Sequence, residues 1–360
     1  MKAIIEGVRI RGFRAVVPKQ RHSYVEEPGI FTPEEAQKLY ATIGVHERRL
    51  LPEPWCASDM CTAAAEGLIR QLDWDPKSID VLVFVSQDAD YVLPVTAAVI
   101  QRRLGLPTSA ACFDVPLGCS GFVYGAWIAS KLLGGSTARR ALVLAGDVSA
   151  RYLHPEDRAT LPLFGDAGSA VALEVDPDAP PMHAIVGTDG AGARHIFVKA
   201  GGKRDCLIPG LEPRTPEEEA RLRRDSRLTL NGAEVFSFTL RAVPPLFRDA
   251  LEHAGLGVDD IDMVVPHQAN RMMLEHIRKK VGFAPERYII DMEKFGNTSS
   301  ASIPLAVCHR LGDALAEKPM RLMMAGFGVG WSWGTLIAEV GPIARPELHE
   351  LAEDFAPLEV

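Results

Sequence analysis

Three residues far apart in the chain have types that could do chemistry together. Cys119 stands in Pro-Leu-Gly-Cys-Ser-Gly-Phe, His267 in Pro-His-Gln-Ala-Asn, and Asn297 in Phe-Gly-Asn-Thr-Ser-Ser-Ala-Ser. Small and apolar residues follow Cys119, as in the first turn of a buried helix, where the helix dipole and free backbone amides favour a thiolate. His and Asn add two neutral hydrogen-bond donors. The first hypothesis is therefore nucleophilic chemistry on acyl thioesters.

Each of these residues alone has a commoner structural explanation. An isolated His is more often a structural residue, and Gly-Asn-Thr-Ser is good turn and capping sequence. Their combination favours a catalytic role over these structural explanations. Two neutral donors aimed at a thioester carbonyl could stabilise the enolate formed when a malonyl group loses carbon dioxide. The Gly-rich turn at residues 326–330 could add a backbone amide beside that of Cys119, although a tight strand connection is the alternative.

The elements that must position these residues occur twice. The apolar run at residues 78–85 recurs at 260–267, and the run at 141–146 recurs at 321–326. Short unbroken apolar strands alternating with helices of about ten residues predict an α/β fold with sheets covered on both faces. The repeat predicts two halves of one fold, packed so that the helix at Cys119 and the helix after Asn297 begin in one crevice.

We predict the boundaries of these halves from the same pattern. Residues 1–176 form the N-terminal half with the Cys nucleophile, and residues 177–340 form the C-terminal half with His and Asn. An insertion or flap rich in Gly, Pro and charge interrupts the second half at about 200–227. Residues 341–360 are predicted to be a surface tail or a short docking helix.

Composition narrows the classes of function. The chain has 360 residues and a net charge of -8, which argues against nucleic acid as the main partner. No apolar run approaches the roughly 18 residues of a membrane span, and the N-terminus lacks a targeting pattern. The cysteines lack zinc spacing and are expected to be reduced thiols: Cys56, Cys61, Cys112, Cys119, Cys206 and Cys308. We expect a soluble, unprocessed cytoplasmic protein with no metal and no membrane partner.

Basic residues gather in two places despite the acidic balance. One group lies within residues 194–227, and the other is Arg278, Lys279 and Lys280. Such runs are most often solvated surfaces, and the alternative is a landing surface for an acidic partner or phosphate groups.

These motifs resemble those of the thiolase-superfamily condensing enzymes, in particular the β-ketoacyl-acyl carrier protein synthase III family. The resemblance extends from the first strand to about Val340. Beyond the three motifs above, it includes four further segments: Asp157-Arg158, Phe164-Gly-Asp-Ala-Gly-Ser-Ala, Asn231-Gly-Ala-Glu-Val-Phe236 and Gly-Phe-Gly-x-Gly-x-x-Trp-Gly ending at Gly334.

The resemblance implies a thiolase-like fold, in which two duplicated halves form five α/β/α/β/α layers, and a homodimer. It implies that Cys119 takes an acyl group from acyl-CoA or acyl-acyl carrier protein (ACP). His267 and Asn297 would then assist the decarboxylative condensation with malonyl-ACP or malonyl-CoA. The product would be a 3-oxoacyl thioester for fatty-acid or secondary-metabolite synthesis, including polyketides. No cofactor would be permanently bound.

Further residue roles follow from the resemblance alone. The amides of Cys119 and Val329 would form the oxyanion hole, and Phe327 would shield the site from water. Leu93 would reach into the partner subunit's acyl pocket. The other expected roles are the acyl pocket for Phe164, Ile196 and Phe236, coenzyme A contacts for Arg158 and Asn270, and carrier-protein docking for Lys279 and Lys280.

Some positions depart from the family pattern and suggest a specialised relative. Lys38 stands about where the family has a Trp that stacks with Arg158 on the adenine, so an ACP donor or an altered nucleotide contact is an alternative to coenzyme A. Val329 replaces a glycine and narrows the turn. Met272 and Ser237 replace basic residues of the docking surface. The pair Arg194 and His195 would favour a carboxylated primer.

Other classes of protein use parts of the same residue set. A papain-like protease has Cys, His and Asn in this order, but its Cys-Gly-Ser-Cys-Trp signature is absent. A thiolase needs a second Cys in the C-terminal Gly-rich loop, whereas Cys308 precedes that loop. Type III polyketide synthases share the triad with different flanking motifs. An acyltransferase that works without decarboxylation and a non-catalytic partner of a condensing enzyme remain alternatives, disfavoured by Asn297 and by the intact triad respectively.

Overall fold

Two sheets form the body of the protein, and their strands come from both ends of the chain. The computed structural model describes residues 1–27, 29–205 and 215–359. The first sheet has the order β15-β2-β8-β7-β5-β6 and the second has the order β1-β9-β14-β13-β12. The strands of the first are β2 (Val8–Val17), β5 (Val81–Val85), β6 (Ala111–Val115), β7 (Arg140–Asp147), β8 (Ala167–Val175) and β15 (Glu347–Glu350). Those of the second are β1 (Lys2–Ile5), β9 (Met182–Thr188), β12 (Met263–Pro266), β13 (Met320–Gly328) and β14 (Ser332–Val340).

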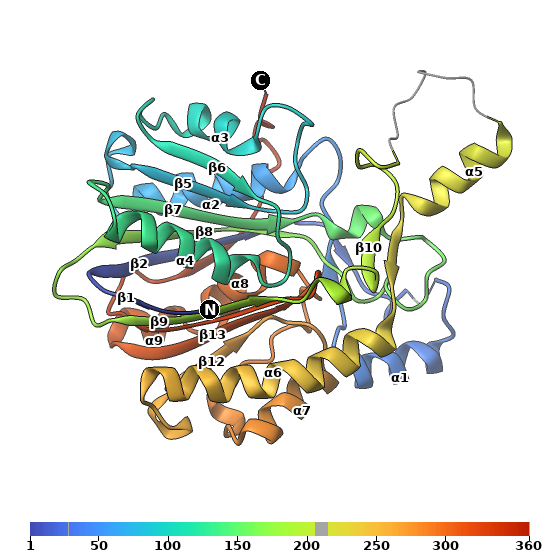
Figure 1. Cartoon of the computed structure of the whole chain (residues 1–360). Helices are drawn as coiled ribbons and strands as arrows, with labels where there is room; N and C mark the ends of the chain where they lie inside the picture. The colour runs from blue at the N-terminus through green and yellow to red at the C-terminus, as the bar shows by residue number, and fades with distance from the viewer. Residues whose placement is uncertain (28, 206–214, 360) are drawn as a thin grey trace.

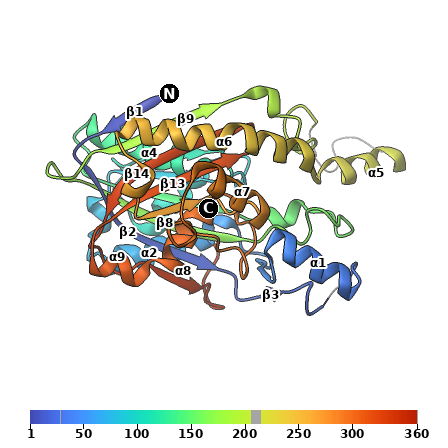
Figure 2. The same ribbon diagram turned by 90° about the horizontal axis from the view of Figure 1, so that it is seen from below.

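Helices cover both sheets and fill the space between them (Figure 1). Between the sheets lie α4 (Gly121–Gly134) and α8 (Ser302–Arg310), while α2 (Ala57–Gln71) and α3 (Thr96–Leu104) cover the outer face of the first sheet. The outer face of the second is covered by α6 (Gly232–Ala254), with α7 (Arg271–Val281) packed beside α6 (Figure 2). The remaining helices are α1 (Pro33–Ile43), α5 (Pro216–Asp225) and α9 (Gly312–Glu317). The predicted five-layer α/β/α/β/α architecture is confirmed.

The sequence of α4 explains how it fits between two sheets. All five side chains of β5 are buried, which is typical of a strand covered on both faces. Small residues on α4 bring its backbone against this strand: a Cβ added to Gly121 would lie 2.5 Å from Val85 Cγ1, and one added to Gly125 would lie 2.6 Å from Val85 Cγ2. The close approach fixes the start of α4, and so the position of Cys119 just before it.

The repeat seen in the sequence corresponds to a repeated topology. The strand order β2-β8-β7-β5 in the first sheet matches β9-β14-β13-β12 in the second. In the first sheet β8 and β7 are antiparallel and β5 is parallel to β7; in the second, β14 and β13 are antiparallel and β12 is parallel to β13. A short 3-10 turn precedes each of the two parallel strands: η1 (Pro76–Ser78) before β5 and η4 (Val258–Asp260) before β12. The boundary at residues 176 and 177 falls between β8 and β9, and the division into halves there stays a prediction. The ends of the chain cross over, because β1 pairs with β9 and β15 pairs with β2.

The prediction of a surface tail or docking helix at residues 341–360 is wrong. Residues 347–350 form β15, which pairs in parallel with β2 and completes the edge of the first sheet. Beyond it, Trp55 Nε1 donates a hydrogen bond of 2.9 Å to Phe355 O, and Leu358 N donates one of 2.7 Å to Asp59 Oδ1. The charged sequence Glu-Leu-His-Glu carries no strand signal of its own, and the unpaired edge of β2 supplies the backbone partners.

Replacing Leu351 by alanine is expected to lower the free energy of unfolding by about 2–3 kcal/mol, because a buried leucine is lost with little room for the core to collapse. Leu351 is only 6% exposed and packs in the cluster that includes Leu68 and Leu82. Denaturant unfolding followed by circular dichroism measures the change, with exposed Leu132 replaced by alanine as the control. A loss below about 0.5 kcal/mol, as is usual for surface substitutions, would contradict the docked terminus.

The predicted insertion is an arm between two short paired strands. β10 (Ile196–Val198) pairs antiparallel with β11 (Leu228–Leu230), and α5 extends away from the body (Figure 1). Lys199 Nζ lies 2.9 Å from Asp225 Oδ2 and ties the arm to its own base. Residues 206–214, with Cys206 and Arg214, lie outside the described residues.

A further pair of short strands, β3 (Arg21–His22) with β4 (Arg48–Arg49), lies near α1. In the part of the chain that the structure describes, no helix has the length and apolar character needed to cross a bilayer.

Candidate active site

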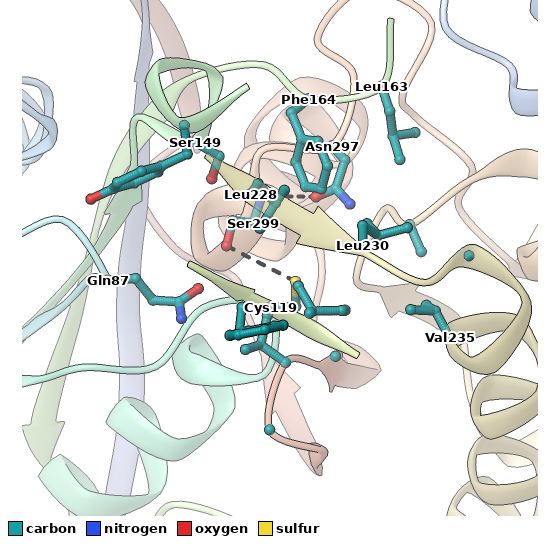
Figure 3. A pocket seen from close by; sticks show the side chains of 18 of the residues that line it. Gln87, Cys119, Ser149, Leu163, Phe164, Leu228, Leu230, Val235, Asn297 and Ser299 are labelled. Atoms are coloured by element: carbon teal, nitrogen blue, oxygen red, sulfur yellow. Dashed lines mark hydrogen bonds between the residues drawn. The ribbon is translucent and has the colours of Figure 1, made fainter. Parts of the chain in front are cut away.

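A cavity of about 940 Å³ contains all three residues predicted to act together. Cys119, His267 and Asn297 line it, and they come from the start of α4, the end of β12 and the loop before α8. Figure 3 shows Cys119 and Asn297 in this cavity. The two central helices and the two sheets therefore meet at one site, as the repeat predicted. Among the described residues, no group of three or more His, Cys, Asp or Glu side chains is arranged to hold a metal ion.

The sulfur of Cys119 is held in a narrow, dry space. Cys119 is 8% exposed, and its Sγ lies 4.0 Å from Ser299 Oγ. A Cβ added to Gly328 would lie only 2.9 Å from this Sγ, so the turn opposite the sulfur requires glycine at that position. Burial raises the pKa of the Cys119 thiol to about 11, and the negative charge of Asp147 adds to the rise. Burial therefore opposes the thiolate that the helix start was expected to favour.

Backbone amides converge on the same sulfur. The amides of Val329 and Cys119 and the Ser299 hydroxyl lie near enough to the sulfur to favour its ionised form and so oppose the rise in the pKa of Cys119. Ser332 Oγ donates 2.7 Å to Val329 O and lies 2.7 Å from Ser120 Oγ, which fixes the turn that carries Val329. This arrangement supports the predicted oxyanion hole, since an oxygen bonded next to this sulfur would lie near both amides.

His267 is uncharged in this setting. Its side chain is 1% exposed, and burial lowers its pKa to about 3. Its Nδ1 lies 2.8 Å from Ser302 Oγ on α8. The ring edge meets Phe327 in a T-shaped contact with 5.6 Å between ring centroids. The neutral histidine expected from the sequence is consistent with this environment.

Asn297 presents its amide nitrogen to the cavity because its amide oxygen is already used. Asn297 is 5% exposed, and its Oδ1 accepts a hydrogen bond of 3.0 Å from Ser299 N. Its backbone is held by the loop before β8: Asn297 N donates 2.8 Å to Leu163 O, and Gly165 N donates 3.1 Å to Asn297 O. The Nδ2 group thus remains available as a donor.

Asp147 joins the two halves behind the nucleophile. Its carboxylate accepts hydrogen bonds from Ser300 N at 3.0 Å and Ser300 Oγ at 2.6 Å, and from Gln87 N at 2.8 Å. The loop after Asn297 is therefore fixed to the end of β7. Burial and the neighbouring Asp88 charge raise the pKa of Asp147.

The other predicted residues divide into two groups. Phe164, Ile196, Phe236, Asn270, Phe327 and Val329 line the cavity with the triad. Leu93, Arg158, Lys279 and Lys280 do not: Leu93 is 83% exposed on the loop before α3, and both lysines are exposed at the end of α7.

Two expectations about charge near the cavity change with the structure. Arg158 Nη2 lies 2.7 Å from Glu35 Oε2 on α1, and the Arg158 guanidinium lies 5.0 Å above the ring of Phe31, just before α1. The positive charge of Arg158 is therefore already engaged by this segment. His195 stacks on Trp331 with 5.6 Å between ring centroids, and neither Arg194 nor His195 lines the cavity. The proposed preference for a carboxylated primer based on that pair therefore has no support.

Several cavity residues were missed by the sequence analysis. Gln87, Asp88, Ser149 and Tyr152 line the side next to β5 and the 3-10 turn η2 (Ser149–Tyr152). They follow the ends of β5 and β7, and polar residues directly after buried strands are the signal that could have found them. Ser299 and Ser302 lie within the Asn297 motif, but residue type alone did not separate their roles.

The rate of Cys119 alkylation by iodoacetamide is expected to rise about tenfold per pH unit between pH 6 and 9. The thiolate is the reactive form, and a pKa of about 11 keeps its fraction small and increasing throughout this range. Intact-protein mass measured over time gives the rate, with Cys119→Ala subtracting reaction at other cysteines. A rate that levels off within this range would indicate an ordinary pKa, of about 8.5, or a lowered one, and would contradict the effect of burial.

Comparisons with known proteins agree with the geometry of the site. Two family models match: 3-oxoacyl-[acyl-carrier-protein (ACP)] synthase III over residues 113–196, and the C-terminal model of the same family over residues 251–340. A β-ketoacyl-[acyl-carrier-protein] synthase III of Symbiobacterium thermophilum is 34% identical over 299 residues, covering 83% of this chain and 88% of that protein. The relative of the same description from Deinococcus deserti is 34% identical over 294 residues, covering 81% and 79%. The crystal structure of a 3-oxoacyl-(acyl-carrier protein) synthase from Burkholderia xenovorans superposes with a TM-score of 0.89 and 38% identity, covering 98% of this chain and 99% of that one.

Proposed function

The chain belongs to the 3-oxoacyl-acyl carrier protein synthase III family, and from this premise we propose how its cavity performs a two-step acyl transfer. It is a condensing acyltransferase that makes a 3-oxoacyl thioester. The observation that carries the assignment of roles is the convergence of Cys119, His267 and Asn297 on one cavity, with the amide of Val329 beside the sulfur.

In the first step Cys119 takes the acyl group. Its Sγ forms a bond to the thioester carbonyl carbon, the bond from that carbon to the donor sulfur breaks, and the thiol proton passes to the departing sulfur. Because burial keeps the resting thiol protonated, the amides of Cys119 and Val329 are needed to stabilise the tetrahedral oxyanion as it forms. The proposal assigns them this role.

In the second step a malonyl thioester enters the acylated site. Its bond to the carboxylate breaks, carbon dioxide leaves, and the electron pair moves to the thioester oxygen as an enolate. Asn297 Nδ2 and the neutral His267 donate hydrogen bonds to that oxygen in our proposal. The enolate carbon then attacks the acyl carbonyl, a carbon–carbon bond forms, and the bond to Cys119 Sγ breaks. The sulfur leaves as a thiolate and takes a proton from solvent, which restores the resting thiol.

We propose a carrier-bound thioester as the preferred acyl donor. Arg158 is already paired with Glu35 and stacked on Phe31, and Lys38 is exposed on α1, so a nucleotide would have to displace these contacts to use the Arg158 guanidinium. Lys279 and Lys280 are exposed at the end of α7 and would meet an acidic carrier protein. Arg158 and Asn270 remain the proposed contacts if coenzyme A is used. No permanently bound cofactor is required.

We also propose a cytoplasmic homodimer. Val92 and Leu93 are 86% and 83% exposed, on a loop whose neighbours Tyr91 and Val95 are also exposed and apolar. Adjacent exposed apolar side chains mark interaction surfaces. In our proposal this loop enters the acyl pocket of the partner subunit, and light scattering of the purified protein tests the dimer.

Intact-protein mass spectrometry tests the function. The protein is exposed to matched panels of acyl-ACP and acyl-CoA thioesters, and then malonyl-ACP is added. We expect an acyl adduct, formed faster from acyl-ACP, and its conversion to a 3-oxoacyl product. The absence of an adduct from every donor would overturn the proposal.

A further inference from the structure

The side of the cavity next to η2 is polar, whereas the opposite side is apolar. Gln87 and Asp88 follow β5, and Ser149 and Tyr152 belong to η2. In Figure 3, Gln87 and Ser149 lie on one side of Cys119, and Leu230 and Val235 lie on the other. An acyl group bonded to Cys119 would therefore have a polar wall on one side.

Two groups of this wall have no protein partner in the described parts of the chain. The Gln87 carboxamide packs against the nucleophile turn, where a Cβ added to Gly118 would lie 2.2 Å from Gln87 Oε1. Only the backbone amide of Gln87 is bonded, to Asp147. The Ser149 hydroxyl likewise has no hydrogen bond to the described residues. As far as the described residues are concerned, both groups can bind a ligand or water.

Asp88 affects which charged groups of a substrate can bind beside this wall. Its Oδ2 accepts a hydrogen bond of 2.6 Å from Val148 N, and the Tyr152 hydroxyl also bonds to its carboxylate. Asp88 is thus satisfied by the protein and does not need a substrate donor. Burial raises the pKa of Asp88, and a substrate carboxylate beside it would meet the same cost of losing water, which argues against a dicarboxylic acyl group.

A plain hydrocarbon chain fits this wall poorly. It would strip water from the Gln87 carboxamide and the Ser149 hydroxyl and give no hydrogen bond in return. A hydroxyl on the acyl chain would restore those bonds, because it both donates and accepts. Its methylene groups would still contact Ile196 and Leu230 on the apolar side.

We propose that the acyl group carried by Cys119 is hydroxylated, and that Gln87 and Ser149 bind its hydroxyl. The inference rests on the proposed function, since it concerns the first substrate of the same site. The class of primer is therefore a neutral hydroxyacyl thioester rather than an alkanoyl or a carboxylated one.

The test compares rates of Cys119 acylation by butyryl, octanoyl, 3-hydroxybutyryl and 3-hydroxyoctanoyl groups on one carrier protein. We expect each hydroxyacyl group to react at least about tenfold faster than the alkanoyl group of equal length. In the double variant Gln87→Met and Ser149→Ala, this preference should disappear and octanoyl acylation should rise. Thr239→Val, which removes a cavity hydroxyl that belongs to α6 and not to η2 or the loop after β5, is the matched control and should keep the preference.

The outcomes separate this inference from the proposed function. If no thioester labels Cys119, the proposed function itself fails. If alkanoyl groups react as fast as hydroxyacyl groups, or if the double variant leaves the preference unchanged, the function stands and the hydroxylated primer is overturned.

A separate observation concerns the proton on His267. Ser302 Oγ lies 2.8 Å from His267 Nδ1 and 2.9 Å from Ser299 O, and Gln268 N donates to it at 3.4 Å. The hydroxyl has one proton and two possible acceptors. If that proton points to Nδ1, the imidazole carries its own proton on Nε2; if it points to Ser299 O, Nδ1 is protonated and Nε2 has a lone pair.

We infer that Ser302 is a positioning residue that places the proton of His267 on Nε2. Among the described residues, its hydroxyl is the only group within hydrogen-bond distance of Nδ1, so it is the one side chain that can hold Nδ1 as an acceptor. The decarboxylation step needs a donor at Nε2, whereas attack by Cys119 does not.

Ser302→Ala is therefore expected to separate the two steps. Acylation of Cys119, measured by intact mass, should stay within about threefold, while condensation of the preformed acyl-enzyme should slow at least about tenfold. Ser302→Thr keeps the hydroxyl and should restore condensation. A variant that loses both steps equally, or neither, overturns the inference, because a packing defect at Ser302 would not act on condensation alone.

Discussion

Replacement of Cys119 by alanine is expected to abolish the acyl-enzyme and to reduce product formation by at least about a thousandfold. Among the described cysteines, Cys119 alone lines the cavity, and the Val329 amide is directed at its sulfur. Removing a covalent nucleophile leaves only binding and the oxyanion donors, which cannot form the intermediate. The measurement is intact-protein mass after exposure to the best acyl donor, followed by product analysis with malonyl-ACP.

Cys112→Ala is the matched control for this result. Cys112 lies on β6, is half-buried, and does not line the cavity. It should form the same adduct at the same rate as the unchanged protein. An adduct of equal yield in Cys119→Ala, or loss of the adduct in Cys112→Ala, would move the nucleophile elsewhere and contradict the mechanism.

The sequence predicted the parts of the site that depend on local motifs. Cys119, His267 and Asn297 each end or precede an element whose apolar pattern is strong, and the internal repeat predicts that those elements meet. The topology of β5 and β12, with their parallel partners, follows from the same pattern. These features were predictable because strand ends and helix starts fix where a side chain lies.

Features that depend on contacts between distant segments were not predictable. The pKa of Cys119 reflects burial by both halves and the charge of Asp147, none of which the motif reveals. The pairing of Arg158 with Glu35 joins residues 123 positions apart in the chain. β15 forms only because the edge of β2 is open to it. In each case residue type was known, but the environment that sets its role was not.

Asn297→Asp is expected to leave acylation within about threefold and to slow condensation at least about a hundredfold. The aspartate oxygen can still accept the hydrogen bond from Ser299 N, at 3.0 Å in the present structure, so the loop should keep its shape. The donor at Nδ2, however, becomes an acceptor with a negative charge that opposes the enolate. Removing one oxyanion donor commonly costs about a hundred- to a thousandfold in rate.

Acylation by intact mass and release of carbon dioxide from malonyl-ACP measure the two steps separately in this variant. Asn231→Asp, at the start of α6 and outside the cavity lining, controls for the added charge and should keep both steps. If Asn297→Asp condenses at the normal rate, the amide is not an enolate donor. If it loses condensation yet the unchanged protein also transfers its acyl group to an alcohol or amine, the same cavity supports a non-decarboxylating transfer. Retention of acylation with loss of carbon dioxide release would instead tie Asn297 to the step in which the carbon–carbon bond of malonyl breaks, because that is where its free Nδ2 would meet developing charge.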